Sequence, residues 1–123
     1  MIKYDVEVNE KIWHIKFGSK IAKLIGSYGY TWGDTTRFVN GIVPDAASLA
    51  HEYGHVGKAN ILRYALSSTI GKLWGDKYAL NQEAMANEYA KIHKNDAVFV
   101  QAADTLRRRL PSDWPTVTIT NTP

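Results

Sequence analysis

The stretch LAHEYGHVGKANILRYA, residues 49–65, constrains the fold more than any other segment of the chain. Its apolar spacing predicts a helix, yet it contains Gly54 and Gly57, and each glycine costs a helix about 1 kcal/mol relative to alanine. The same stretch carries His51, Glu52 and His55 within one helical turn. We therefore look for a packing or chemical reason why a small protein accepts this loss of helix stability.

Length and composition limit the class of protein. The chain has 123 residues, 45% of them hydrophobic, which suffices for one core and is too little for two. We expect a single α+β domain over residues 1–110 and a polar tail over 111–123. There is no cysteine, so disulfides, thiolate metal ligands and a cysteine nucleophile are excluded.

Neither a long apolar run nor a leader-like start appears in the sequence. The first residues, MIKYDVEVNEKIWHIKF, alternate charged and apolar side chains instead of grouping them. We therefore expect no membrane partner and a cytoplasmic location.

The net charge is +3, and Arg107, Arg108 and Arg109 form its one dense basic cluster. Such a cluster is either the solvated end of a helix or a nucleic-acid patch. No aromatic residues interleave with these arginines, as a platform for single strands needs. The solvated helix end is the better interpretation, and no nucleic-acid partner is expected.

Local patterns predict the remaining elements. Alternation and turn residues predict strands at 3–8, 11–17 and 35–39, with turns at 9–10 and 40–41. Apolar spacing and capping residues predict helices at 19–25, 46–67, 81–93 and 96–109, the second capped by Asp45. The tail is either a loose end or a strand borrowed by a neighbour.

The residues His51-Glu52-Tyr53-Gly54-His55 form an HExxH sequence. On a helix, positions i and i+4 lie about 40° apart and roughly 6 Å along the axis, so both imidazoles can converge on one metal ion. Glu52 lies close enough to take a proton from a metal-activated water but is turned too far to be a ligand. The alternative is that the two histidines are only a polar helix face.

A catalytic zinc usually keeps three protein ligands and one open position. The best third candidate is Glu83, and Asn87, one turn later, could hold a metal-bound imidazole through its amide. Glu88 lies about 140° around the helix from Glu83 and is interpreted as a solvated charge. His93 lies about 15 Å further along an unbroken helix, so it is an alternative to Glu83 and not an addition. A site without a third protein ligand is the remaining alternative.

Two further features have competing explanations. The glycines at 54 and 57 allow close packing by a neighbouring element or clearance for a substrate, and we favour packing because Gly57 faces away from the histidines. An oxyanion donor beyond the metal could come from Tyr78, or with less support from Arg63, Tyr64 or Tyr89. Each of these is otherwise a core aromatic or a solvated cation. The tryptophans at 13, 32, 74 and 114 are interpreted as packing residues, with no organic cofactor implied.

The segments HEYGHV and YALNQEAMANEYA together resemble the gluzincin metallopeptidases, whose pattern is HExxH followed by a downstream glutamate-bearing helix. They are most similar to the minimal versions, the small zincin-like domains common in phages and bacterial injection-particle clusters, which implies a phage- or particle-associated location as the alternative to a cytoplasmic one. The resemblance covers about residues 28–93. It implies a zincin-like fold, Zn²⁺ held by His51, His55 and Glu83, and Glu52 as general base. Asn87 stands where the family usually has aspartate.

The resemblance also implies that the strand before the active-site helix is a sheet edge to which an extended peptide adds. In this chain that strand is 35–39, and Thr36, Arg37 and Phe38 would be its substrate-binding residues. The alternative is an ordinary edge strand without a ligand.

These observations predict a zinc-dependent metallopeptidase that hydrolyses an amide bond of a peptide or protein substrate. One rival is a zinc-stabilised structural or binding module, such as a particle component, which the short chain and Asn87 favour somewhat. The other is a metal hydrolase acting on a cell-wall cross-link. The sequence specifies neither the substrate nor the oligomeric state.

Overall fold

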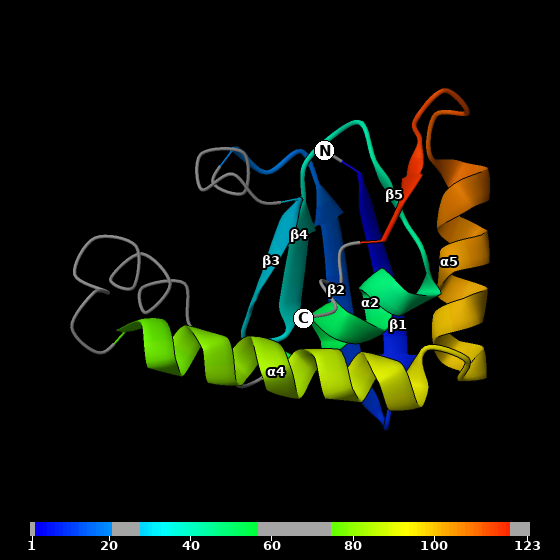
Figure 1. The fold of residues 1–123 in the computed structure, drawn as a ribbon. Coiled ribbons are helices and arrows are strands. Elements are labelled where there is room, and N and C mark those ends of the chain that lie inside the picture. Colours follow the sequence, from blue (N-terminus) through cyan, green and yellow to red (C-terminus); the bar gives the residue numbers. More distant parts are fainter. Residues whose placement is uncertain (1, 21–27, 57–74, 119–123) are drawn as a thin grey trace.

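The structure, a computed structural model, describes residues 2–20, 28–56 and 75–118, with the side chains of 75–83 outside the description. This part of the chain forms a small α+β fold with a short mixed sheet, a two-stranded sheet and three helices (Figure 1). In chain order the elements are β1 (Lys3–Val8), β2 (Lys11–Phe17), β3 (Gly29–Trp32), β4 (Thr35–Phe38), β5 (Val43–Pro44), α2 (Ala46–Tyr53), α4 (Gly75–His93), α5 (Ala97–Arg109) and β6 (Thr116–Val117).

The first two strands form the hairpin that the alternation predicts. They pair antiparallel, and the turn residues Asn9 and Glu10 have φ of 52° and 67°. Left-handed conformations at both turn positions match the right-handed twist of the strands, and asparagine tolerates this conformation well. Along β2, the inward-facing residues Trp13, Ile15 and Phe17 are buried, which fixes the face of the sheet that carries the core.

In the described part of the chain the sheet has the order β1-β2-β4-β3, so β3 lies at its edge and β4 in its interior. β4 pairs in parallel with β2 on one side and antiparallel with β3 on the other. The strand predicted at 35–39 is therefore confirmed, but the expectation that it forms the sheet edge is wrong. β3 itself was not predicted, because the short segment GYTW follows a glycine-rich run without clear alternation.

Three of the expected helices lie in the described ranges. α2 begins where Asp45 was expected to cap it, and the Asp45 carboxylate accepts a hydrogen bond from the Ser48 amide at 2.8 Å. The helix ends at Tyr53, so an unbroken helix from 46 to 67 is wrong; residues 57–67 lie outside the described ranges. α4 begins at residue 75 and not at 81, whereas α5 agrees with its prediction. Most of the helix expected at 19–25 lies outside the described residues.

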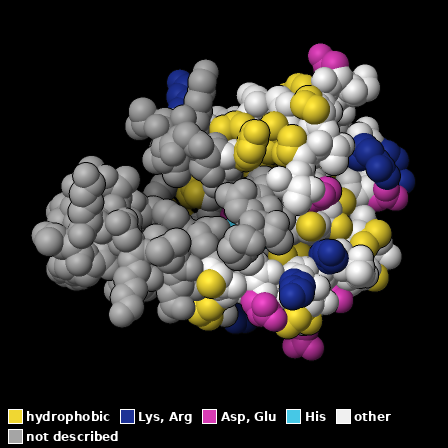
Figure 2. All heavy atoms as spheres, in the orientation of Figure 1, with side chains coloured by type: hydrophobic (Ala, Val, Ile, Leu, Met, Phe, Trp, Pro, Cys, Tyr) yellow, Lys and Arg dark blue, Asp and Glu magenta, His cyan; other side chains and the backbone are white. Residues whose placement is uncertain are grey.

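The arginine cluster is the exposed last turn of α5, as the sequence suggested. Arg107 pairs with Asp104, and the guanidinium of Arg109 lies 5.1 Å from the centroid of the Tyr4 ring. Cations at this position interact favourably with the carbonyl end of a helix. On the face shown in Figure 2, basic side chains are interspersed with acidic ones.

The described part of the predicted tail contains strand β6. β6 pairs in parallel with β5 of the same chain, and the Val117 carbonyl accepts hydrogen bonds from the Asp45 amide at 3.2 Å and the Ser48 hydroxyl at 3.1 Å. Thr118 donates to the second carboxylate oxygen of Asp45. Of the two alternatives predicted for the tail, pairing with a neighbouring strand is therefore the one observed for residues 116–117, and the partner is β5.

The core lies between the sheet and the helices. Trp13 of β2 packs edge-on against Tyr53 of α2 and Phe99 of α5, with ring centroids 5.3 Å and 6.2 Å apart. Figure 1 shows α4 passing across one end of the strands and α5 standing beside them, with α2 inside this frame. Within the described ranges, no helix combines the length and the apolar character needed to cross a bilayer.

Candidate metal centre

Helix α2 is buried on nearly all sides. Five consecutive residues, from Ser48 to Glu52, are buried, because the helix packs against β3, β5, α4 and α5 together. The motif side chains belong to this interior: His51, Glu52 and His55 are 2%, 3% and 3% exposed. A merely polar helix face would turn toward water, since buried polar groups cost free energy unless they are satisfied.

The two imidazoles converge at the end of α2. Their ring centroids are 5.1 Å apart at an interplanar angle of 79°, and the Nδ1 atoms of both rings are buried. A tetrahedral ion about 2.1 Å from one nitrogen of each ring would place the two centroids about 5 Å apart. The separation of His51 and His55 thus fits one shared zinc ion.

The backbone tightens within the motif. The amide of His55 donates to the Glu52 carbonyl at 3.0 Å, and the amide of Val56 to the Tyr53 carbonyl at 2.9 Å. These i→i−3 bonds replace the i→i−4 pattern, as often occurs in the last turn of a helix. His55 therefore sits in a turn that follows α2 and not in an unbroken helix.

Glu52 is tied to the edge strand. The Thr31 hydroxyl of β3 lies 3.1 Å from both the carboxylate oxygen Oε2 and the main-chain oxygen of Glu52. Thr31 itself is 2.6 Å from the hydroxyl of Thr36, which accepts a hydrogen bond from the Trp13 indole at 2.9 Å. Sequence reasoning missed Thr31 and Trp13 here, since neither stands in a recognisable motif.

Close packing by helix α4 explains why a glycine stands at position 54 inside the motif. A methyl group at this position would lie 3.0 Å from the Ala86 Cα, 3.1 Å from the His51 carbonyl oxygen and 3.2 Å from the Tyr89 Cβ. Helix α4 therefore crosses α2 directly at Gly54, and the close-packing explanation is confirmed for this residue. Gly57 lies outside the described residues.

Gly54→Ala is expected to lower the free energy of unfolding by about 1 kcal/mol, because overpacking costs about 2 kcal/mol and alanine recovers about 1 kcal/mol of helix propensity. The backbone at Gly54 is helical (φ −59°, ψ −21°), so alanine meets no backbone strain and the cost arises from overpacking against α4. Chemical denaturation of Gly54→Ala and Gly54→Val measures the effect, which should increase with side-chain size. An unchanged or raised midpoint for Gly54→Ala would show that the crossing tolerates a side chain.

Helix α4 brings the downstream candidates toward the motif. Ala86 and Ala90 are buried against the core, and the side-chain oxygen of Asn87 is buried as well. Glu83 lies in the same helix one turn before Asn87, but its side chain, like that of Tyr78, is outside the description. Among the described side chains, no third histidine, cysteine, aspartate or glutamate completes a metal-binding group.

The remaining candidates have other environments. His93 ends α4 and its Nδ1 lies 2.7 Å from the Asp96 carboxylate, at the junction with α5. Tyr89 packs against the rings of Tyr53 and Phe99, and burial, followed by the charges of Tyr53 and Asp96, raises the pKa of Tyr89 to about 12. Tyr89 is therefore a neutral packing residue at ordinary pH. Arg63 and Tyr64 lie outside the described residues.

Strand β4, which was expected to bind a substrate as the sheet edge, lies in the interior of the sheet. Thr36 and Phe38 of β4 are fully buried, and Arg37 between them is partly buried. Because β4 is bonded on both sides, its main chain cannot accept a further strand. The edge that borders the motif is β3, which carries Thr31 and ends at Trp32.

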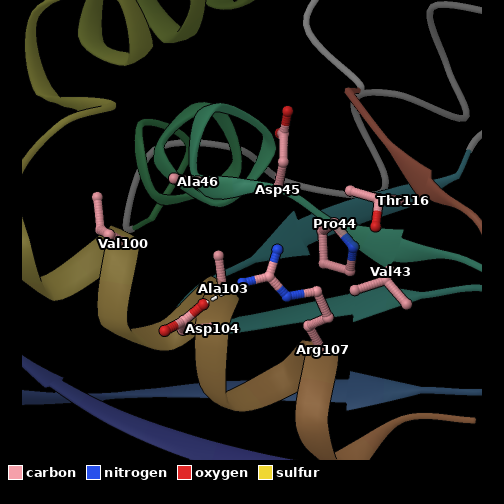
Figure 3. Close-up of a pocket in the computed structure, with 9 residues that line it drawn as sticks. All are labelled: Val43, Pro44, Asp45, Ala46, Val100, Ala103, Asp104, Arg107 and Thr116. Atoms are coloured by element: carbon pink, nitrogen blue, oxygen red, sulfur yellow. Dashed lines mark hydrogen bonds and ion pairs between the residues drawn. The ribbon is translucent and has the colours of Figure 1, made fainter. Parts of the chain in front are cut away.

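A cavity lies at the opposite end of α2 from the histidines (Figure 3). Its walls come from β5, the start of α2, α5 and β6. The charged side chains at its wall are engaged: Asp45 caps α2 and accepts from Thr118, and Arg107 pairs with Asp104. The cavity therefore belongs to the junction between the tail and α5 and is separate from the motif.

Comparison of the chain with protein-family models, with curated proteins and with solved structures finds no match.

Proposed function

We propose that this protein is a zinc-dependent metallopeptidase with a minimal zincin-like fold. The observation that carries the proposal is the buried, converging pair His51 and His55, whose ring separation fits a shared tetrahedral ion. The intervening Glu52 is also buried and is held by the edge strand. A solvent-facing polar helix face does not explain the burial of all three side chains.

The third zinc ligand in this proposal is Glu83. Helical periodicity places positions 83, 86, 87 and 90 on one side of α4, and Ala86 on that side meets α2 at Gly54. A ligand from position 83 would therefore start one turn from the crossing point. Asn87, whose side-chain oxygen is buried, would orient one of the imidazoles.

A zinc ion at this position would supply Lewis acidity, lowering the pKa of a water molecule and polarising a carbonyl group. Glu52 would take the proton from the attacking water and pass it to the leaving amine. Tyr78 is retained as the candidate donor to the developing oxyanion. His51, His55 and Glu83 hold the metal and take no part in proton transfer.

The substrate would bind along β3. This strand is the sheet edge that contacts α2, and an extended peptide added there would pass beside Glu52. Tyr28, which precedes β3, and Trp32, which ends it, are each 49% exposed and offer apolar contacts to peptide side chains. We therefore propose that a peptide pairs with the main chain of β3 and not with that of β4.

The proposal is tested by incubating the zinc-loaded protein with a mixture of synthetic peptides and identifying cleaved products by mass spectrometry. Cleavage is expected with zinc, should stop when 1,10-phenanthroline removes the metal, and should return after zinc is added back. Cleavage that persists without metal would contradict the proposal.

A zinc-stabilised module without turnover is the second candidate. It is favoured by Asn87, which adds no negative charge where the resembled family has aspartate. In that case the chelator would lower the melting temperature and no peptide in the mixture would be cut.

A further inference from the structure

Three polar side chains are buried side by side on the core face of the sheet. Trp13, Thr31 and Thr36 are 1%, 3% and 0% exposed, and they come from β2, β3 and β4. The register places Thr31 directly opposite Thr36 in the β3–β4 pair. Valine would fill the same space without a polar atom, so hydroxyl groups at both positions require an explanation.

The hydrogen bonds link these side chains to Glu52 in a single series. The Trp13 indole nitrogen lies 2.9 Å from the Thr36 hydroxyl oxygen, and the Thr36 and Thr31 hydroxyl oxygens are 2.6 Å apart. The Thr31 hydroxyl oxygen lies 3.1 Å from Glu52 Oε2. An indole N–H only donates and a carboxylate only accepts. Both ends of the series are therefore fixed, and each hydroxyl accepts from the Trp13 side and donates toward Glu52.

We propose that Trp13, Thr36 and Thr31 form a hydrogen-bond chain that positions the Glu52 carboxylate for proton transfer. This inference rests on the proposed function, in which Glu52 is the general base. The bond from Thr31 engages Oε2 of this carboxylate. The same hydroxyl lies equally close to the Glu52 main-chain oxygen, so its single proton is shared between the two acceptors.

The direction of the series gives it a function beyond packing. Each hydroxyl that accepts a hydrogen bond becomes a better donor, so Trp13 strengthens the final bond to Glu52 across two intermediates. Because Thr31 stands in the strand that we propose binds the peptide, the same strand would align both the substrate and the base. Thr31, Thr36 and Trp13 are positioning residues, since none of them is assigned a contact with the reacting atoms.

The kinetic test uses the zinc-loaded protein and the best-cleaved peptide from the mixture. Thr31→Val should lower kcat about 10- to 100-fold with unchanged KM and unchanged zinc content, because supporting residues of metal sites typically contribute that much. Thr31→Ser restores the hydroxyl and should restore most of kcat. Thr35→Val is the matched control, since the Thr35 hydroxyl bonds only Asp34 on the exposed side, and it should leave kcat unchanged.

An undiminished kcat in Thr31→Val would overturn the proposal. So would a failure of Thr31→Ser to restore activity, because the effect would then come from side-chain shape. A drop in zinc content or in melting temperature that tracks the loss of kcat would assign Thr31 a structural role instead.

A second readout does not depend on turnover. Glu52→Gln replaces a charged acceptor at the end of the series by a neutral one, so the indole proton resonance of Trp13 should shift in the NMR spectrum. In a Thr31→Val background the same Glu52→Gln change should leave that resonance in place, and the Trp114 indole should not respond in either case.

The two readouts separate the inference from the proposed function. A protein that binds zinc and cuts no peptide refutes the peptidase, and the Trp13 resonance then decides whether the chain reaches Glu52. If Glu52→Gln leaves the Trp13 indole resonance unchanged, the proposed hydrogen-bond chain is refuted even if the protein is an active peptidase.

Discussion

Glu52→Gln is expected to lower kcat for peptide cleavage by about 10²- to 10⁴-fold and to leave one zinc bound per chain. The amide has nearly the shape of the carboxylate, and its oxygen can still accept the hydrogen bond from Thr31 that the native side chain receives. It cannot, however, take a proton from water. Fold and metal site should therefore persist while the proton-transfer step fails.

The measurement is steady-state kinetics beside elemental analysis of the same samples, with Glu7→Gln as the matched control. Glu7 lies on the exposed side of β1, so its substitution should change neither quantity. Full activity in Glu52→Gln would remove the general-base assignment and with it the enzyme proposal. Loss of zinc in Glu52→Gln would instead give the carboxylate a part in holding the metal.

His55→Ala is expected to abolish zinc binding and the stability that zinc confers. At a zinc concentration 100 times the dissociation constant, a bound metal stabilises the folded state by about 2.7 kcal/mol. For a domain of this size that corresponds to a melting temperature on the order of 10 °C higher with zinc than without it. Removing one of the two converging imidazoles should eliminate this difference.

Calorimetric melting with and without zinc measures the effect, and His93→Ala is the matched control. His93 pairs with Asp96 at the end of α4, so its loss should leave the zinc-dependent shift intact. If His55→Ala kept the shift, the two rings would not be joint ligands. If His93→Ala lost it, His93 would have to be reconsidered as the third ligand.

The hairpin and α5 could be predicted because their signals are local. Alternation along β1 and β2 reports directly which side chains face the core, and the turn at Asn9 and Glu10 needs only two residues. The same applies to Asp45, whose side chain caps the amide three residues later. Each of these features is decided within a few residues of chain.

The order of strands could not be predicted from local signals. Whether β4 is an edge depends on β3, a four-residue strand that is recognisable only from its pairing with β4. Because β3 was not predicted, the sequence analysis took β4 for the sheet edge and named Thr36, Arg37 and Phe38 as substrate-binding residues. Helix α2 was likewise expected to continue past His55, because nothing in the local pattern indicates that its last turn tightens.

The candidate site shows the same division. HExxH predicted that His51 and His55 converge, since i and i+4 are neighbours on any helix. Gly54 contacts Ala86 of α4, 32 positions later in the chain, and Glu52 contacts Thr31, 21 positions earlier. No local sequence pattern indicates contacts between residues so far apart. Sequence reasoning thus identified the candidate side chains His51, Glu52 and His55, which the structure shows to be buried, and missed Thr31, whose hydroxyl contacts Glu52.

The most direct test of the account is the zinc content of the purified protein beside Glu83→Ala, with Glu88→Ala as control. Glu88 is an exposed residue of the same helix, so its substitution should not affect the metal. The account predicts one zinc per chain in the parent and in Glu88→Ala, and a large loss in Glu83→Ala. A parent protein that takes up no zinc even after the metal is added would contradict it, and His51 and His55 would then be buried histidines without a metal.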